Sequence, residues 1–204
     1  MKTKEDLIYC ENEIALLWNS GDAPFLIHLS GGNEEQLIEI FEKIKPEDFI
    51  FSTHRSHYHY LLAGGSLEEL KKIVLENKSM FIFNKKLNFF TSSIVAGTPA
   101  IAAGMAQSIK INGEKKHVWC FIGDAAEDEG HFYEAVRFVD GFDLPCTFIL
   151  EDNDRSVSST KEQRRGKSSI EWPKCVQKYE YKITYPHAGS GTKNKIIFKD
   201  IKHE

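Results

Sequence analysis

The sequence lacks an excess of basic residues. Its 204 residues include 26 lysines and arginines against 30 aspartates and glutamates, a net charge of −4. A chain without a basic surplus is poorly suited to duplex DNA or an anionic membrane. No apolar run approaches the ~20 residues of a membrane span. The first residues are acidic where a signal peptide is apolar. We therefore expect neither nucleic acid nor a membrane as partner.

Cysteine is also scarce, with four residues and no CxxC pair. Cys120 and Cys146 lie inside apolar runs, which predicts buried thiols, a reducing compartment and a cytoplasmic location. The chain shows no internal repeat and no low-complexity linker, so we expect residues 1–204 to form a single domain.

Periodic apolar residues and capping signals predict several helices. Asn33 with Gln36, and Ser66 with Glu69, have the spacing of a capping box. The predicted helices span residues 4–18, 33–44, 67–76 and 99–110.

A strand–helix–strand unit is the most informative part of the chain. Residues 117–124 and 144–153 are apolar runs that end in polar groups, and residues 129–141 between them form an amphipathic helix. Such runs are typical of parallel strands buried on both faces. The fold class is therefore α/β, an open and mostly parallel sheet with helices on both faces. Residues 178–185 predict a late strand, and the polar segment near 156–172 predicts a mobile loop.

Two oxygen donors follow the two strands of this unit. Asp124 ends the first run and Asn153 the second. The carboxyl ends of neighbouring parallel strands lie at the same edge, where open α/β sheets bind ligands. A carboxylate and an amide suit Mg²⁺ or Ca²⁺ better than zinc. A strand-end aspartate that merely caps a helix is the alternative.

The loop after Asp124 is acidic, and residues 123–130 contain no lysine or arginine. An anionic ligand would be repelled there unless a divalent cation accompanied it. The small residues Gly123, Ala125 and Ala126 leave backbone amides accessible to a phosphate near a helix start.

These segments carry a family resemblance. GDAAEDEGHFYEAV (123–136) and LPCTFILEDN (144–153) resemble the GDG…NN signature for thiamine diphosphate. The pattern is most similar to the alpha subunits of thiamine-dependent 2-oxo acid dehydrogenases. Supporting agreements, in chain order, are HLSGGNEE (28–35), THRSH (53–57), SMFIF (79–83) and IVAG (94–97).

The resemblance implies a magnesium site. It assigns Mg²⁺ to Asp124, Asn153 and the backbone carbonyl of Arg155. Ala125 replaces a glycine of the signature, and Asp152 replaces its first asparagine. The extra charge of Asp152 is expected to point away from the phosphates.

The resemblance also implies how the rest of the cofactor is held. Arg55 matches an arginine that binds the diphosphate, and a guanidinium suits phosphate oxygens. His54 stands where the family has a tyrosine, and a surface ion pair is the alternative role for Arg55. Ser93 and Val95 match the positions that offer backbone groups to the aminopyrimidine ring.

Three histidines match active-site histidines of the family. His28 and His57 do so within well-aligned segments, and His187 within a faint match to a late loop. A buried core histidine is the alternative for His28. His54, His57 and His59 could also be considered as a zinc cluster, although their spacing is loose.

The implied activity is decarboxylation of a 2-oxo acid with thiamine diphosphate and Mg²⁺. In the family, a beta-type subunit supplies the glutamate that activates the cofactor, so we expect activity only in a two-alpha, two-beta assembly. This chain is shorter than typical members, and Phe81 replaces a histidine. The alternatives are a split transketolase-type ketol transferase and a non-catalytic cofactor-binding or scaffold subunit.

Overall fold

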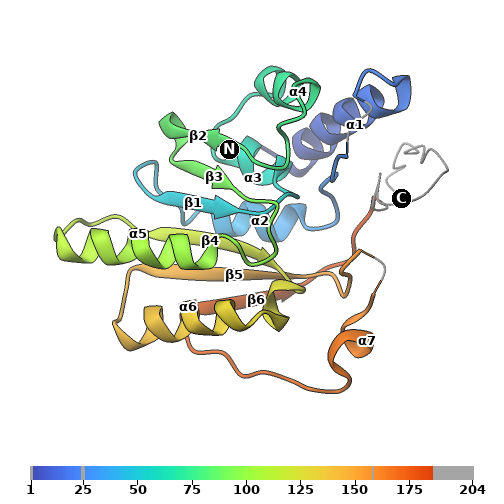
Figure 1. The fold of residues 1–204 in the computed structure, drawn as a ribbon. Coiled ribbons are helices and arrows are strands. Elements are labelled where there is room, and N and C mark those ends of the chain that lie inside the picture. Colours follow the sequence, from blue (N-terminus) through green and yellow to red (C-terminus); the bar gives the residue numbers. More distant parts are fainter. Residues whose placement is uncertain (1, 24–25, 158, 186–204) are drawn as a thin grey trace.

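The computed structural model describes residues 2–23, 26–157 and 159–185 (Figure 1). These residues form a six-stranded sheet with the order β2-β3-β1-β4-β5-β6. Only the β2–β3 pair is antiparallel, so the predicted mostly parallel sheet is confirmed. The strands are β1 (Phe49–Ser52), β2 (Phe83–Asn84), β3 (Phe89–Thr91), β4 (Val118–Gly123), β5 (Cys146–Asp152) and β6 (Val176–Glu180).

Helices form close to the five predicted segments, and two short helices that were not predicted occur at His57–Leu62 and Lys161–Arg165. A capping box at Ser66 begins α4, as its spacing predicts, and a proline occupies the first turn of α5. The helices are α1 (Lys4–Ser20), α2 (Glu34–Phe41), α3 (His57–Leu62), α4 (Leu67–Leu75), α5 (Pro99–Ile111), α6 (Gly130–Gly141) and α7 (Lys161–Arg165), with short 3-10 turns at Lys85–Leu87 and Ala126–Asp128.

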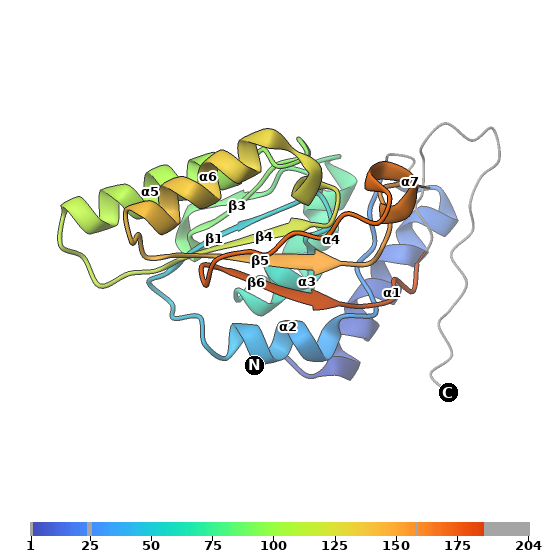
Figure 2. The ribbon, with the colours of Figure 1, turned by 90° about the horizontal axis from the view of Figure 1, so that it is seen from below.

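Helices cover both faces of the sheet (Figure 2). Alternate residues of β4 point to opposite sides: Trp119 and Phe121 pack towards α1–α4, and Cys120 and Ile122 towards α5 and α6. Burial on both sides explains why the strand reads as one continuous apolar run. Burial also raises the pKa of Cys120 to about 12, which keeps its thiol protonated.

The chain changes direction across the sheet between β1 and β4. From β1 the chain builds β2 and β3 on one side, and α5 then returns it to β4 on the other side of β1. Such a reversal leaves a crevice at the carboxyl ends of the two strands, which is where open α/β sheets bind ligands. No helix among the described residues is long and apolar enough to cross a membrane.

Three local predictions differ from the structure. The late strand predicted at 178–185 is β6, which begins two residues earlier and ends at Glu180. Asn33 precedes α2 but makes no side-chain cap. Its side-chain Nδ2 donates to Glu151 Oε1 and Tyr179 Oη, each at 3.0 Å. These bonds fix the side chain with Oδ1, the atom that would accept a capping bond, away from the helix amides. The polar segment predicted as a loop contains α7, which begins with a capping box at Thr160. The mobility of this segment stays a prediction.

Candidate functional site

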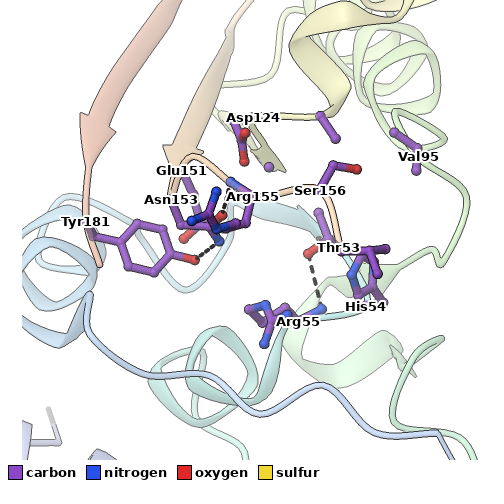
Figure 3. Close-up of a pocket in the computed structure, with 13 residues that line it drawn as sticks. Thr53, His54, Arg55, Val95, Asp124, Glu151, Asn153, Arg155, Ser156 and Tyr181 are labelled. Carbon is purple, nitrogen blue, oxygen red and sulfur yellow. Dashed lines mark hydrogen bonds between the residues drawn. The ribbon is translucent and has the colours of Figure 1, made fainter. Parts of the chain in front are cut away.

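A cavity lies at the carboxyl ends of the parallel strands (Figure 3). Its volume is about 140 Å³. It is lined by residues at or after the carboxyl ends of β1, β3, β4, β5 and β6, namely Thr53, His54, Arg55, Val95, Gly123, Asp124, Ala125, Glu151, Asn153, Arg155, Ser156, Val157 and Tyr181.

Asp124 and Asn153 line this one cavity, as their strand-end positions predict. Strand pairing sets Gly123 beside Glu151, so the residues that follow β4 and β5 emerge at neighbouring points. The Asp124 side chain is 1% exposed, and burial raises the pKa of its carboxyl group above the usual value. A carboxylate held in so little water is well placed to bind a cation.

The Asn153 side chain is held in a fixed orientation. Its Oδ1 accepts from the Arg155 amide at 2.9 Å, and its Nδ2 donates to Tyr181 Oη at 3.0 Å. Burial and the neighbouring Glu151 carboxylate raise the pKa of Tyr181, so the tyrosine hydroxyl stays protonated. The amide oxygen has a second lone pair and could accept another ligand.

Arg55 brings a positive charge to the same cavity. It follows β1, its backbone amide donates to Thr53 Oγ1 at 3.2 Å, and its guanidinium donates to the carbonyl oxygen of Leu29. Burial lowers the pKa of Arg55, although nearby acidic groups oppose this effect. A half-buried guanidinium that lines the cavity provides positive charge for an anionic ligand.

The buried carboxylate of Glu11 contacts two segments that lie next to Arg55, one at Ser30 and one at His57. Glu11 of α1 is fully buried, lies 3.0 Å from His57 Nδ1 and accepts from the Ser30 amide. Ser30 directly follows Leu29, the acceptor of the Arg55 guanidinium. Glu11 therefore fixes the segments on both sides of that contact.

Helix α7 supplies the positive charge that the acidic loop lacks. Arg164 contacts Asp124 through Nη2 and Oδ2 at 2.6 Å, and Asp128 through Nε and Oδ2 at 2.8 Å. Arg165 contacts Glu127 at 2.6 Å and Asp128 at 3.2 Å. The acids expected to repel an anion are therefore paired with cations from α7.

Most residues proposed to bind the cofactor or the metal line the cavity, although Ser93 and Ala126 do not. His28 is buried with its ring centroid 4.3 Å from that of His54, at the edge of the site. His57 is absent from the lining and is held by Glu11. His187 lies outside the described residues.

The zinc alternative is wrong for the described part of the chain. His54 packs against His28, His57 binds Glu11, and the His59 ring lies 4.5 Å from that of Phe121. Among the described residues, no three or more His, Cys, Asp or Glu side chains are placed so that they could hold one metal ion. The expected Mg²⁺ site does not require such a group, since an amide and a backbone carbonyl supply two of its ligands.

Several cavity residues escaped the sequence analysis: Thr53, Glu151, Ser156, Val157 and Tyr181. Glu151 stands at the end of an apolar run, where its charge could have marked it. Thr160 and Gln163 have the spacing of a capping box, which could have revealed α7. Nothing local to Asp124 indicated its contact with Arg164, forty positions along the chain.

Comparison with known proteins places this arrangement in a family. The sequence profile of the family "Dehydrogenase E1 component" matches residues 4–174. The chain belongs to the Dehydrogenase E1 component family. The matched region contains α7 and every cavity residue except Tyr181.

The E1 relatives include subunits of two kinds of complex. The alpha subunit of acetoin:2,6-dichlorophenolindophenol oxidoreductase from Bacillus subtilis is 28% identical over 70% of this chain and 46% of its own length. The alpha subunit of the pyruvate dehydrogenase E1 component from Rickettsia bellii is 27% identical over 74% of this chain and 49% of its own length. The chain thus spans about half the length of these relatives.

Proposed function

We propose that this E1-family chain binds thiamine diphosphate through Mg²⁺ and acts as the alpha-type subunit of an enzyme that decarboxylates a 2-oxo acid. The observation that carries the proposal is the convergence of Asp124, Asn153 and Arg55 on one cavity. An acidic side chain, an amide and a guanidinium are the groups that a cation–diphosphate complex requires.

The residues of the cavity fit this ligand. Asp124, Asn153 and the carbonyl of Arg155 would hold Mg²⁺, and Arg55 would bind diphosphate oxygens. The chemistry that thiamine diphosphate supplies when bound is carbon–carbon cleavage beside a ketone carbonyl, with its ring as electron sink. The protein's own part is to bind and orient the diphosphate end, and His28 beside His54 is our candidate for orienting the 2-oxo acid.

The size of the cavity supports a shared active site. At about 140 Å³ it is smaller than the roughly 300 Å³ at which small-molecule sites usually begin. The described residues enclose one end of the cofactor, and we propose that a beta-type partner encloses the other in a two-alpha, two-beta assembly. The two relatives described above are both named as alpha subunits, which agrees with an alpha-type role for this chain.

Calorimetry with thiamine diphosphate and Mg²⁺ tests the proposal. We expect the wild-type chain to bind the cofactor, and Asp124→Asn to lower the affinity at least tenfold. Asp140→Asn makes the same substitution at an exposed position of α6 and should leave the affinity unchanged. Equal binding by all three proteins would contradict the metal assignment.

Product analysis tests the reaction itself. The chain co-purified with its beta-type partner should release CO2 from a 2-oxo acid. Ketose transfer instead would indicate a transketolase-type enzyme. Cofactor binding without turnover of either substrate class would indicate a non-catalytic subunit.

A further inference from the structure

Arg164 forms an ion pair with the Asp124 carboxylate, the group to which we assign the Mg²⁺ that accompanies thiamine diphosphate. Its Nη2 lies 2.6 Å from Asp124 Oδ2, and the same guanidinium binds Asp128 and the carbonyl oxygen of Ser159, the latter at 3.0 Å. Only 15% of the Arg164 side chain is exposed. The guanidinium is therefore held by three acceptors, and a cation must compete with it for Asp124.

Each carboxylate that surrounds Arg164 already has a cationic partner. Four carboxylates gather here, and the cations that contact them also number four among the described residues. The carboxylates belong to Asp124, Glu127, Asp128 and Asp152, and the cations to Lys161, Arg164, Arg165 and Lys178. A bare divalent cation would add its full positive charge to these paired groups, whereas a cation that arrives with a diphosphate carries compensating negative charge.

Helix α7 fixes Arg164 in this position. Thr160 begins the helix with a reciprocal cap, in which its Oγ1 accepts from the Gln163 amide at 3.2 Å and its amide donates to Gln163 Oε1 at 2.9 Å. Lys161 attaches the first turn to Asp152 at 2.5 Å. An intramolecular competitor held in this way acts at a high effective concentration.

We propose that Arg164 is a specificity-determining residue that prevents free divalent cations from binding at Asp124 and admits the cation together with a diphosphate. This inference rests on the proposed function. The diphosphate complex gains contacts with Arg55 and with Gly123 and Ala125, which line the same cavity, and these contacts offset the loss of the Arg164–Asp124 pair. A free cation gains none of them.

Titration of the full chain with Mn²⁺, alone and with thiamine diphosphate, tests the proposal by calorimetry. Wild-type protein should bind Mn²⁺ at least tenfold more tightly in the presence of thiamine diphosphate. Arg164→Gln should raise the affinity for Mn²⁺ alone about tenfold, since a charge-assisted hydrogen bond of this kind is worth about that factor. Arg164→Lys keeps the charge but not the forked geometry, so its affinity should lie between the two.

Arg165→Gln is the matched control. It removes the same charge from the next residue, whose guanidinium contacts Glu127 and Asp128 and, within the described part of the chain, makes no ion pair with Asp124. We expect it to raise the affinity for free Mn²⁺ about threefold or less, because Arg165 does not compete for an oxygen of Asp124 and its charge acts only over a longer distance. Adding Asp124→Asn to Arg164→Gln should abolish the gain.

The outcomes separate the inference from the proposed function. Equal gains in the two glutamine variants would overturn the inference, because long-range charge would then explain both. Wild-type binding of free Mn²⁺ that thiamine diphosphate does not strengthen would overturn it as well. If no variant binds Mn²⁺ with thiamine diphosphate, the proposed function fails and the inference fails with it. Circular dichroism of each variant establishes that α7 substitutions leave the fold intact.

Discussion

The Glu11 carboxylate and the His57 ring lie against each other with no exposed side-chain surface. Both carboxylate oxygens lie 3.0 Å from His57 Nδ1. Glu11 also accepts from the Ser30 amide. This pair joins α1 to the two segments that flank Arg55, so it couples the stability of the chain to the geometry of the cavity.

Glu11→Gln should weaken both stability and cofactor binding. The amide keeps the volume of the side chain but loses the charge and one acceptor, which costs about 2 kcal/mol in the free energy of unfolding. Relaxation of the Ser30 and His57 segments should displace Arg55 and lower the affinity for thiamine diphosphate. Urea unfolding and calorimetry measure the two effects.

Glu13→Gln is the control on the same helix. Glu13 pairs with Lys71 at 2.8 Å in a partly exposed position, so its loss should cost less than about 1 kcal/mol and leave cofactor affinity unchanged. If the two variants behaved alike, Glu11 would have no special role in positioning the site.

Arg55→Lys should reduce the affinity for thiamine diphosphate about tenfold or more, because a lysine cannot bind two oxygens with a planar fork. Arg155→Lys makes the same substitution in the same cavity. Its expected contribution is a backbone carbonyl, so the affinity should stay within about threefold of wild type. The reverse order of effects would show that Arg155, and not Arg55, binds the diphosphate.

His117 should make stability fall in mild acid. Its ring is partly buried, with Nε2 2.8 Å from Thr147 Oγ1, and its amide donates to Asp48 Oδ1 at 2.9 Å. Burial lowers the pKa of His117 from 6.5, and the Asp48 carboxylate only partly opposes this. The unfolded chain therefore takes up the proton first, so this contribution is complete above pH 6.5 and is lost as the pH falls towards the folded-state pKa.

A variant isolates this effect from the other histidines. The stability advantage of wild type over His117→Gln should shrink between about pH 7.5 and about pH 5.5 in urea unfolding. An advantage that stayed constant or grew over this range would contradict the assigned direction.

The sequence was most informative where a signal was long and repeated. The two apolar runs of β4 and β5 predicted strands buried on both sides, and their polar ends predicted that Asp124 and Asn153 would meet at one edge. Parallel pairing leaves little freedom at this point, because it fixes where consecutive strands end.

Tertiary partners decided the features that the sequence did not reveal. Asn33 is a residue type that often caps helices, yet its side-chain Nδ2 donates to Glu151 and Tyr179, which lie far along the chain, and this fixes the side chain away from a capping position. Arg164 belongs to a helix of five residues, too short to produce a periodic pattern, and its partner Asp124 is distant in sequence. Local propensity carries no information about such contacts.

Anomalous diffraction from crystals grown with Mn²⁺ and thiamine diphosphate tests the central claim most directly. We predict a manganese peak about 2.2 Å from a carboxylate oxygen of Asp124 and from the amide oxygen of Asn153, with Arg164 moved away from Asp124. A bound cofactor whose manganese lies elsewhere, with Arg164 still on Asp124, would contradict the account.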